Sequence, residues 1–511
     1  MTGALSRPIV WLGQWMGRPS FVWWTIAFYV VCGIAFSIAI HWGTVSTDSA
    51  GNEIVSSNFI VPDEDRHTAA ILYYADRGWW RGPVISHLNS QYLVEGELQR
   101  EPSFLYYWVM SIVVSALRLI TTSYDVAVVV LRLINVAFGA LGLFIVWRTL
   151  LRTRIGPRTA ALAVLALSLT GRYVWQGAGV TYDMPSLLLF FAFVYCAVAL
   201  LTGGGLHNLF FAAAWAVLVS ITKYTYMPFV GVGLVVVILL YWSAVRREGP
   251  GRFRADLTAS FRDARLRSIG ALVLVLVGSV LFVERIVGNL LRFHAVEPDC
   301  ADVHSAAACS SFLIYQRNVD AKRLYLDGLA HGNAPATFDP FTFTGDWLDR
   351  YYRSLYFYLT RDSPLQVSTI AMVLLAIVIV AIIIFIAVNR TPVLVTQAGW
   401  FIAGISAAYL VGIYAFNLHT YLSVEKYYAF SGRYILAIMP FAYAAVIRIV
   451  VTNWRRVRGA WRPWIGIPLI VVTTVTALVN STVIAFLTFG RGAGWFEPWV
   501  VPLLKKLAGM S

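Results

Sequence analysis

An all-α protein that crosses a membrane many times is predicted by three features of the sequence. Hydrophobic residues make up 59% of the 511 residues, and the mean hydropathy is +0.69, which exceeds what a soluble domain can bury. Charged residues are scarce, at 13%. Apolar runs long enough to cross a bilayer core of about 30 Å recur along almost the whole chain. We therefore expect one transmembrane domain over residues 1–511.

The positive charge of the chain lies in short basic runs between the apolar segments. The net charge is +14, and the runs include residues 147–158, 246–267 and 453–462. Basic loops of this kind stay in the cytoplasm, so they indicate a multi-pass protein of the inner or plasma membrane and no nucleic-acid partner. The N-terminus, with Arg7 and Arg18, is expected in the cytoplasm as well.

About eleven transmembrane helices follow when these runs are threaded through the membrane in order. The first, residues 21–42, has no cleavage site of small residues after it, so we interpret it as an uncleaved signal anchor. The other spans are expected at residues 124–147, 159–179, 185–202, 208–223, 226–243, 268–287, 366–388, 398–415, 433–451 and 464–489. This threading places the C-terminus outside.

A further apolar segment, residues 102–120, is expected to lie in the membrane interface. If it crossed the membrane, the later basic runs would be outside. Its Tyr107 and Trp108 suit the headgroup level, because aromatic rings with a polar group favour that depth. Residues 43–120 then form a first external loop with juxtamembrane helices, which we expect to be catalytic, and residues 288–365 form a second external loop.

The four cysteines divide between these regions. Cys300 and Cys309 lie in the second external loop, where thiols oxidise, and their short separation favours a disulfide. Cys32 and Cys196 fall in expected spans and are interpreted as small apolar residues. The sequence contains no CxxC or HExxH motif and no Gly-rich phosphate loop.

Three ionisable residues stand at the expected external ends of separate spans. Asp183 occurs in VTYDMPSLLLFF, Lys223 in SITKYTYMPF and Arg433 in FSGRYILAIMP. A charge near membrane depth costs about 2.5 to 3.5 kcal/mol on insertion scales, which makes it a candidate for function. The structural alternative is that the Lys extends to the interface and the Arg anchors a headgroup. Three such residues on one side of the membrane favour a site for an anionic, membrane-held substrate.

The first external loop faces these residues with an acidic cluster, DEDRH, at residues 63–67. In such a site the cations hold a phosphate, and a carboxylate accepts a proton from an attacking hydroxyl. The alternative is a helix start, in which Asp63 is the N-cap and the acids that follow stabilise the first turn. Both roles are compatible.

These motifs resemble elements of the GT-C superfamily of membrane glycosyltransferases, which includes aminoarabinose transferases and protein O-mannosyltransferases. DEDRH looks like the family's Asp-Glu-x-Arg-Tyr/His signature, and REPSFLYYW at residues 100–108 is similar to its Glu-Lys-Pro-Pro-x-x-Tyr-Trp element. TYDMP at 181–185 resembles the Leu-Asp-Pro motif, ITKYTYMP at 221–228 the Leu-Thr-Lys-Gly motif, and SGRYILAIMP at 431–440 a Gly-Arg-Tyr element. The sequence departs from the family at residues 101–103 and at Tyr224.

The resemblance implies an enzyme with a GT-C-like fold. Such enzymes take a sugar from a polyprenyl-phosphate donor at the external leaflet and pass it, usually with inversion, to a hydroxyl or amine. The acceptor would be a glycan, a lipid or a protein, and the active site would be extracytoplasmic.

Roles for individual residues follow from the same resemblance. Asp63 would be the general base, with Glu64 aiding it or both binding a divalent cation, Mg²⁺ or Mn²⁺. Asp183 would position the acceptor or orient Lys223. The donor phosphate would be bound by Lys223, Arg433 and Arg66, and other parts of the substrates by His67, Glu101 and Tyr224.

Two other functions remain open. A lipid-linked oligosaccharide ligase or polymerase would also have a large external loop and external cations, but we would not expect it to carry an early DExRH element. A flippase or transporter would have a midplane site made from broken helices in repeated halves, and the sequence shows no such repeat.

Overall fold

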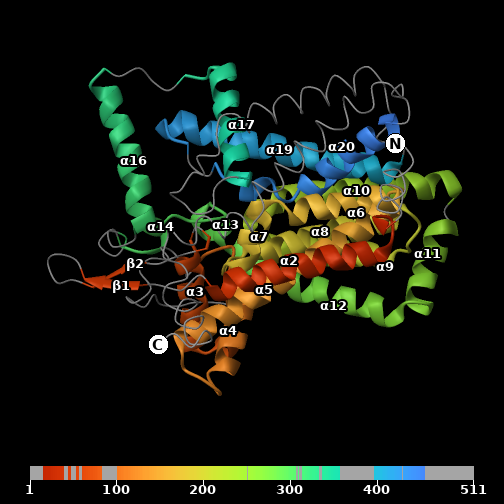
Figure 1. Ribbon diagram of the computed structural model, residues 1–511, viewed down its shortest axis with the longest axis horizontal. Coiled ribbons are helices and arrows are strands. Elements are labelled where there is room, and N and C mark those ends of the chain that lie inside the picture. The colour runs from red at the N-terminus through yellow and green to blue at the C-terminus, as the bar shows by residue number, and fades with distance from the viewer. Residues whose placement is uncertain are drawn as a thin grey trace, which may run out of the picture.

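The computed structural model describes residues 15–39, 44–47, 53–56, 60–61, 63–82, 100–249, 251–305, 309, 313–332, 337–356, 396–427 and 430–454. These residues are mainly helical (Figure 1). A small exception to the all-helical architecture is an antiparallel hairpin of β1 (Thr44–Thr47) and β2 (Glu53–Ser56). Its strands contain Thr, Val and Ile, whose branched side chains favour an extended backbone.

Six helices in the described residues are long and apolar enough to cross a membrane. They are α2 (Pro19–Ala39), α5 (Tyr124–Arg152), α8 (Asp183–Leu201), α10 (Met227–Glu248) with η3 (Tyr224–Tyr226) before it, α12 (Arg265–Phe282), and α19 (Gln397–Val424). The π-helical segment η4 (Val283–Val287) continues α12 into α13 (Gly288–Phe293). Shorter apolar helices are α4 (Leu105–Leu117), α6 (Pro157–Ser168), α9 (His207–Thr222) and α20 (Met439–Trp454), which follows η5 (Gly432–Ile435). The protein is therefore a polytopic membrane protein.

Most of the expected spans match one of these helices. Among the described residues there are two exceptions: 433–451 begins in η5 and continues in α20, and 159–179 forms two helices, α6 and α7 (Gly171–Ala178). The break falls at Thr170, which is extended, and Thr and Gly next to each other are weak helix formers. The spans expected at 366–388 and 464–489 lie outside the described residues, so the count of about eleven stays a prediction.

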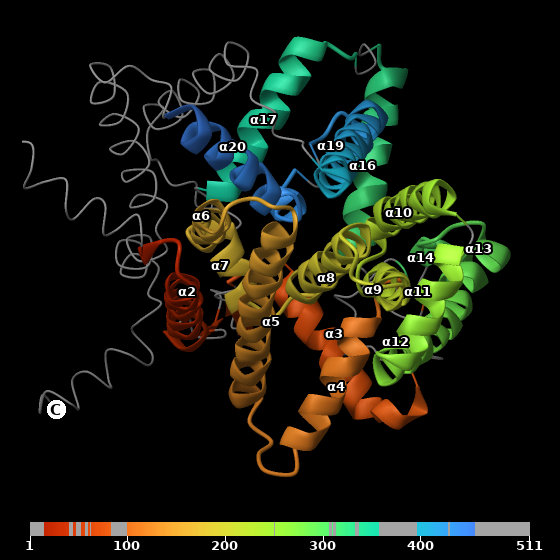
Figure 2. The ribbon, with the colours of Figure 1, turned by 90° about the vertical axis from the view of Figure 1, so that its right-hand side faces the viewer.

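Helix α8 occupies the centre of the bundle. It packs against α5 on one side and α9 on the other, and α9 in turn packs against α12 (Figure 2). Of the most apolar window of α8, 72% is buried, compared with 17% for the helix that begins with α12. This difference follows from sequence, because α8 is apolar all round and can be enclosed by protein on every side.

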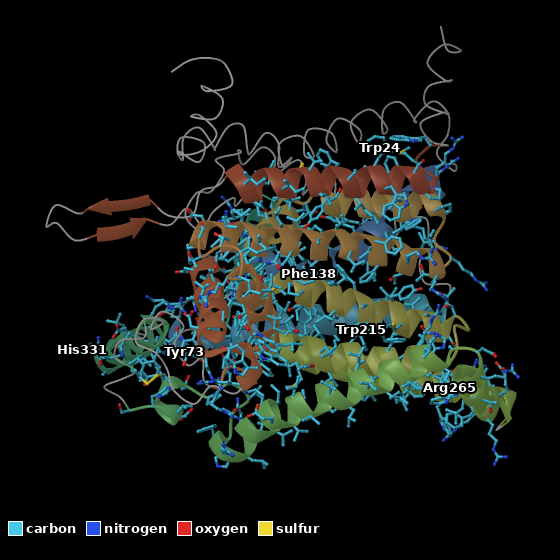
Figure 3. All side chains as sticks on the ribbon, turned by 90° about the horizontal axis from the view of Figure 1, so that it is seen from below. Trp24, Tyr73, Phe138, Trp215, Arg265 and His331 are labelled. Carbon is cyan, nitrogen blue, oxygen red and sulfur yellow. A yellow bond between two sulfur atoms is a disulfide. The ribbon has the colours of Figure 1, made fainter. Side chains whose placement is uncertain are left out.

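Different elements lie at the two ends of the bundle. The remaining helices in the described residues are α3 (Glu64–Arg77), η1 (Trp79–Arg81), α11 (Gly251–Arg262), α14 (Cys300–Val303), α16 (Leu313–Ala330) and α17 (Pro340–Tyr356). The basic helix α11 lies at one end, whereas α3, α14 and the hairpin lie at the other (Figure 1). Figure 3 shows Arg265 at the first end, and Tyr73 and His331 at the second. Segments expected in the cytoplasm are thus separated from those expected outside.

Helices α3 and α4 pack together and lie across the second end of the bundle, at a steep angle to the long helices (Figures 1 and 3). Tyr107, expected at headgroup level, is buried against α3 and the end of the bundle. The position of α4 relative to a bilayer stays a prediction. Its packing shows what it does within the protein: together with α3, it covers the end of the bundle where α8 begins and α9 ends.

The sidedness of the bundle can be tested by thiol labelling. We expect Arg254→Cys on α11 to be protected from a membrane-impermeant thiol reagent added to intact cells, and Asn318→Cys on α16 to react. Both positions are exposed, so accessibility within the protein is matched. Cys32 and Cys196 are buried and would be replaced by Ala to remove background. Reaction at Arg254→Cys with protection at Asn318→Cys would invert the proposed orientation.

Candidate functional site

The charged residues expected at the ends of separate helices meet in one network. The Lys223 ammonium contacts Asp183 Oδ1, and Arg433 Nη1 lies 3.8 Å from Asp183 Oδ2. Arg433 Nη2 lies 3.2 Å from Asp63 Oδ2. The network therefore alternates in charge from Lys223 through Asp183 and Arg433 to Asp63. Its residues come from α8, the end of α9, η5 and the start of α3. They meet at the end of the bundle that α3 and α4 cover.

Helix ends explain why Asp183 and Lys223 stand where they do. Asp183 is the first residue of α8, and Lys223 directly follows the last residue of α9. The partial positive charge of a helix N-terminus stabilises an acid, and the partial negative charge of a C-terminus stabilises a cation. Gln176 of α7 donates a hydrogen bond of 2.6 Å to Asp183 Oδ2, so both carboxylate oxygens are engaged.

The Lys223 ammonium is surrounded by aromatic rings. It lies 4.7 Å from the ring centroid of Tyr434, 5.2 Å from that of Tyr182 and 6.0 Å from that of Tyr226. Ring faces carry partial negative charge and attract a cation, more strongly when water is excluded. A cation held this way needs fewer carboxylates and can keep donors available for an anionic ligand.

Asp63 begins α3 but does not cap it. Its backbone is left-handed, with φ of 65°, and its side chain makes no capping hydrogen bond to the helix. The side chain reaches Arg433 instead, and about a third of it, 35%, remains exposed. Burial alone would raise the pKa of Asp63, but the charges of Arg433 and Arg66 outweigh this and lower it. The predicted helix start is confirmed, but the N-cap role suggested for the Asp63 side chain is wrong, because that side chain pairs with Arg433. Its role as a site residue stays a prediction.

Glu64, the neighbour of Asp63, points to a different partner. Its carboxylate is fully buried and accepts hydrogen bonds from Arg132 Nε at 2.8 Å and Nη2 at 3.1 Å. The backbone N–H groups of Ile60 and Val180 also donate to it, each at 2.8 Å. Arg132 Nη1 in turn donates to the carbonyl of Ser37. Glu64 therefore ties α3 to α5, α2 and the segment before α8.

Arg132 was not singled out from the sequence, although a signal was present. It is an Arg inside the apolar stretch VVVLRLINVAF, and a charge at such depth indicates a buried partner. The partner, Glu64, is 68 residues away in the chain, so sequence spacing alone could not identify it.

His67 lies on the side of α3 that faces α4 and the start of α8. Its Nδ1 is 2.9 Å from the hydroxyl of Tyr107, and its ring meets that of Tyr182 at 4.5 Å. Burial lowers the pKa of His67 to about 3, so the imidazole is neutral at physiological pH. A neutral His67 can hold a polar group of a substrate but adds no charge to the network.

Glu101 and Tyr224 belong to a second polar group beside the network. The Tyr224 hydroxyl donates to Glu297, its backbone N–H donates to Ser103, and the N–H of Ser103 donates to Glu101. Part of Glu297 is exposed, but its carboxylate lies among protein atoms, and this burial together with the charge of Glu101 raises its pKa to about 7. No sequence signal pointed to Glu297.

Arg66 stands between the two groups. Its charge acts on Asp63 in the first and on Glu297 in the second. Within the described residues, no three His, Cys, Asp or Glu side chains gather in a way that could hold a metal ion. The metal-binding role suggested for Asp63 and Glu64 therefore stays a prediction, and their carboxylates bond to Arg433 and Arg132 respectively.

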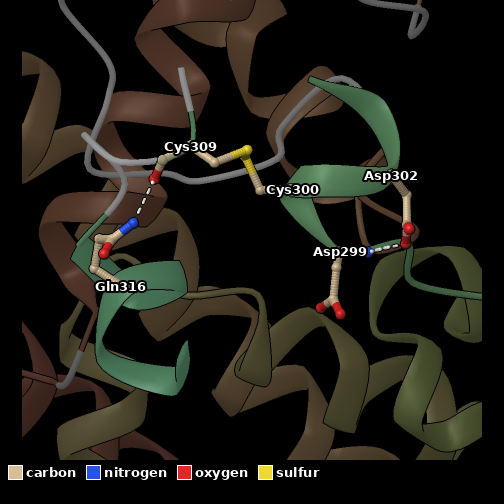
Figure 4. The surroundings of a disulfide bond; sticks show 5 residues. All are labelled: Asp299, Cys300, Asp302, Cys309 and Gln316. Atoms are coloured by element: carbon tan, nitrogen blue, oxygen red, sulfur yellow. Dashed lines mark hydrogen bonds between the residues drawn. A yellow bond between two sulfur atoms is a disulfide. The ribbon is translucent and has the colours of Figure 1, made fainter. Parts of the chain in front are cut away.

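Cys300 and Cys309 form a disulfide, with Cα atoms 5.8 Å apart (Figure 4). Around it, the N–H of Asp299 donates to Asp302 at the start of α14, and Gln316 Nε2 donates to the carbonyl of Cys309. The disulfide thus holds α14 near the start of α16, in the loop that also carries Glu297.

Non-reducing peptide mapping tests this disulfide. Protein matured outside the cytoplasm should yield one cross-linked peptide pair containing Cys300 and Cys309, which separates on reduction. Cys32 and Cys196, which are buried and unbridged, serve as internal controls and should be recovered as free thiols after unfolding. Free thiols at all four positions would contradict both the disulfide and the external location of this loop.

No family model matches the chain, and no curated protein does. Among solved structures, the chain is similar to a crystal structure of ArnT from Cupriavidus metallidurans with undecaprenyl phosphate bound. The sequence identity is 13%, the TM-score is 0.35, and the match covers 85% of this chain and 78% of ArnT. A likeness this weak carries no argument about function, which must come from the site.

Proposed function

We propose that this protein is a membrane glycosyltransferase that moves a sugar from a polyprenyl-phosphate donor to an acceptor on the extracytoplasmic face, with inversion. The observation that carries the proposal is the network of Lys223, Asp183, Arg433 and Asp63. It combines two cations suited to a phosphate with a partly exposed carboxylate, at one end of a membrane bundle. The acceptor is a glycan, a lipid or a protein.

The chemistry asked of such a site is modest. The acceptor oxygen attacks the anomeric carbon, the bond from that carbon to the phosphate oxygen breaks, and the acceptor proton passes to a carboxylate. Polyprenyl phosphate is already a good leaving group, so neutralising its charge and activating the acceptor are the main tasks. Lys223 and Arg433 serve the first task, with Arg66 at the edge of the site.

The exposure of the two carboxylates supports Asp63, and not Asp183, as the base. The Asp63 side chain is 35% exposed and the Asp183 side chain only 2%. Both oxygens of Asp183 are also occupied, by Lys223 and Gln176. We therefore assign the base to Asp63 and the orientation of Lys223 to Asp183. Glu64, bonded to Arg132, acts as a positioning residue that holds the start of α3 and hence Asp63.

A donor panel tests the function directly. Detergent-purified protein would be incubated with several polyprenyl-phosphate sugars and a mixture of acceptors, and release of polyprenyl phosphate would be followed. Release with at least one donor is expected. Consumption of undecaprenyl-pyrophosphate glycans alone would favour the ligase or polymerase. Movement of lipid-linked sugar between leaflets without a new glycoside would favour the flippase.

Lys223→Ala is expected to weaken donor binding and turnover together, by about ten-fold or more. A charge-assisted contact is worth about 1.5 to 3 kcal/mol, and one made in both ground and transition states affects both quantities. Donor affinity would be measured by ligand titration and turnover by the release assay. Arg152→Ala is a matched control, because Arg152 also lies over an aromatic ring, that of Tyr195, but in a basic run expected in the cytoplasm. If Lys223→Ala bound the donor with wild-type affinity, Lys223 would not bind the donor phosphate, and its role would be structural, at the end of α9.

A further inference from the structure

Arg172, on α7, is a buried cation beside the network. The residue is 4% exposed, and its Nε donates a hydrogen bond of 2.9 Å to the backbone carbonyl of Ser354. Its Nη1 is also buried and has no hydrogen-bond partner in the described part of the chain. A buried guanidinium costs free energy unless it is paired, so a single carbonyl bond leaves it incompletely compensated.

Ser354 connects Arg172 to the network. Its backbone carbonyl accepts from Arg172, and its hydroxyl accepts from the N–H of Gly432, the residue before Arg433. Gly432 lies so close to α17 that a Cβ there would be 2.6 Å from Leu355 Cα. Arg172 and Arg433 are therefore held on either side of one residue. The charges of Arg433 and Asp183 both act on the Arg172 guanidinium, in agreement with a place beside the network.

Arg433 also has a nitrogen donor that makes no hydrogen bond within the described residues. Two of its nitrogens pair with Asp63 and Asp183, but its Nε is buried without a hydrogen-bond partner among the described residues. Gln176 lies four residues after Arg172 on α7, so the two side chains are on the same face of that helix. Gln176 donates to Asp183, and this face of α7 therefore borders the network. Two guanidinium donors thus lack a hydrogen-bond partner among the described residues, and the charge of Asp183 acts on both guanidinium groups. Neighbouring like charges repel each other, and this arrangement becomes favourable when an anion binds them both.

The charges of the network support the same conclusion. Lys223, Arg433 and Arg172 are three cations, whereas Asp63 and Asp183 are two carboxylates, and His67 is neutral. One positive charge is left over in a largely buried place. Arg66 is left out of this count because it stands between the network and the group of Glu101 and Glu297, and its charge acts on both Asp63 and Glu297. A phosphodiester carries one negative charge and would balance the surplus.

We propose that Nη1 of Arg172 and Nε of Arg433 together bind the phosphodiester of the lipid-linked donor, so that Arg172 is a further anion-binding residue. The inference deepens the proposed function and rests on it. It adds that the phosphate is held from the α7 and α17 side of the network as well as from Lys223. Guanidinium groups suit this role because their planar donors match phosphate oxygens.

The test compares binding of a charged and a neutral lipid. The probes are methyl undecaprenyl phosphate, a phosphodiester without a sugar, and undecaprenol, which shares its tail. Arg172→Gln should weaken binding of the phosphodiester by about ten-fold or more, as expected for loss of a charge-assisted hydrogen bond, and leave undecaprenol binding unchanged. Arg152→Gln, remote from the network, should bind both probes as the wild type does.

Thermal stability without ligand separates this role from a structural one. Removing an incompletely compensated buried charge should leave the midpoint of unfolding unchanged or raise it. A lower midpoint with an unchanged ratio of phosphodiester to undecaprenol affinity would overturn the proposal. If Arg172→Gln does not fold, Arg172→Lys carries the test, because it keeps the charge and loses the planar donors. Wild-type phosphodiester affinity in that variant would also overturn it.

The outcome also distinguishes this proposal from the proposed function. Sugar transfer with wild-type phosphodiester affinity in Arg172→Gln would leave the function intact and remove the role of Arg172. If the wild type transferred no sugar from any donor but Arg172→Gln still weakened phosphodiester binding, the proposed function would fail. The anion-binding role of Arg172 would remain.

Discussion

Asp63→Asn is expected to reduce sugar transfer by about 10² to 10⁴-fold, the usual contribution of a positioned general base. The amide has the size of the carboxylate and can still accept a hydrogen bond from Arg433, but it cannot take a proton from the acceptor. Donor binding should therefore survive, since Lys223 and Arg433 remain in place. The measurement is turnover by the release assay together with donor affinity by titration, so that the two effects can be separated.

Asp65→Asn provides the matched control for this experiment. Asp65 belongs to the same acidic cluster and the same first turn of α3, but it makes no ion pair with the network among the described residues. Turnover near the wild-type rate is expected. If Asp63→Asn also kept that rate, the base would have to be another group, and Asp63 would be a partner of Arg433 only.

Glu64→Gln is expected to cost about 3 to 5 kcal/mol of stability, because it leaves Arg132 charged and buried without its carboxylate. The new amide NH₂ would also face N–H donors of Ile60, Val180 or Arg132, all of which now donate to Glu64. Thermal unfolding in detergent measures the effect as a large drop in the midpoint. This change acts on the fold, so any loss of transfer should follow the loss of folded protein.

A double variant makes the interpretation specific. Replacing both partners by apolar residues, Glu64→Leu with Arg132→Met, removes the unpaired charge and should recover part of the stability lost in either single variant. Full recovery is not expected, because the N–H groups of Ile60 and Val180 lose their acceptor. Additive losses in the double variant would show that the two side chains do not stabilise each other.

The partners of Asp63 and Glu64 could not be predicted from the sequence. They are adjacent, both acidic, and both were expected at the start of a helix in a catalytic loop. The left-handed backbone at Asp63 and the start of α3 send the two carboxylates to different partners, Arg433 and Arg132. These partners lie 370 and 68 residues further along the chain. No local pattern distinguishes the two acids, because the distinction depends on which helices surround them.

Asp183, Lys223 and Arg433 could be found from the sequence for the opposite reason. Each interrupts or borders an apolar stretch, and the cost of a charge at that depth makes it conspicuous without any knowledge of its partner. Arg132 and Arg172 stand in similar surroundings, so the same rule applied throughout would have marked them as well. Glu297 lies in an ordinary polar loop, where acids are common and carry no such signal.

Composition and hydropathy by themselves determined that the protein is a helical, polytopic membrane protein, where most of its long helices lie, and which helix ends carry charge. These are local properties, because each span must satisfy its own backbone hydrogen bonds and exclude charge from the lipid. Tertiary structure alone decided that Lys223, Asp183, Arg433 and Asp63 form one network, that Glu64 belongs to Arg132, and that Arg172 borders the site. Such pairings depend on how distant helix ends pack together, which the order of residues along the chain does not encode locally.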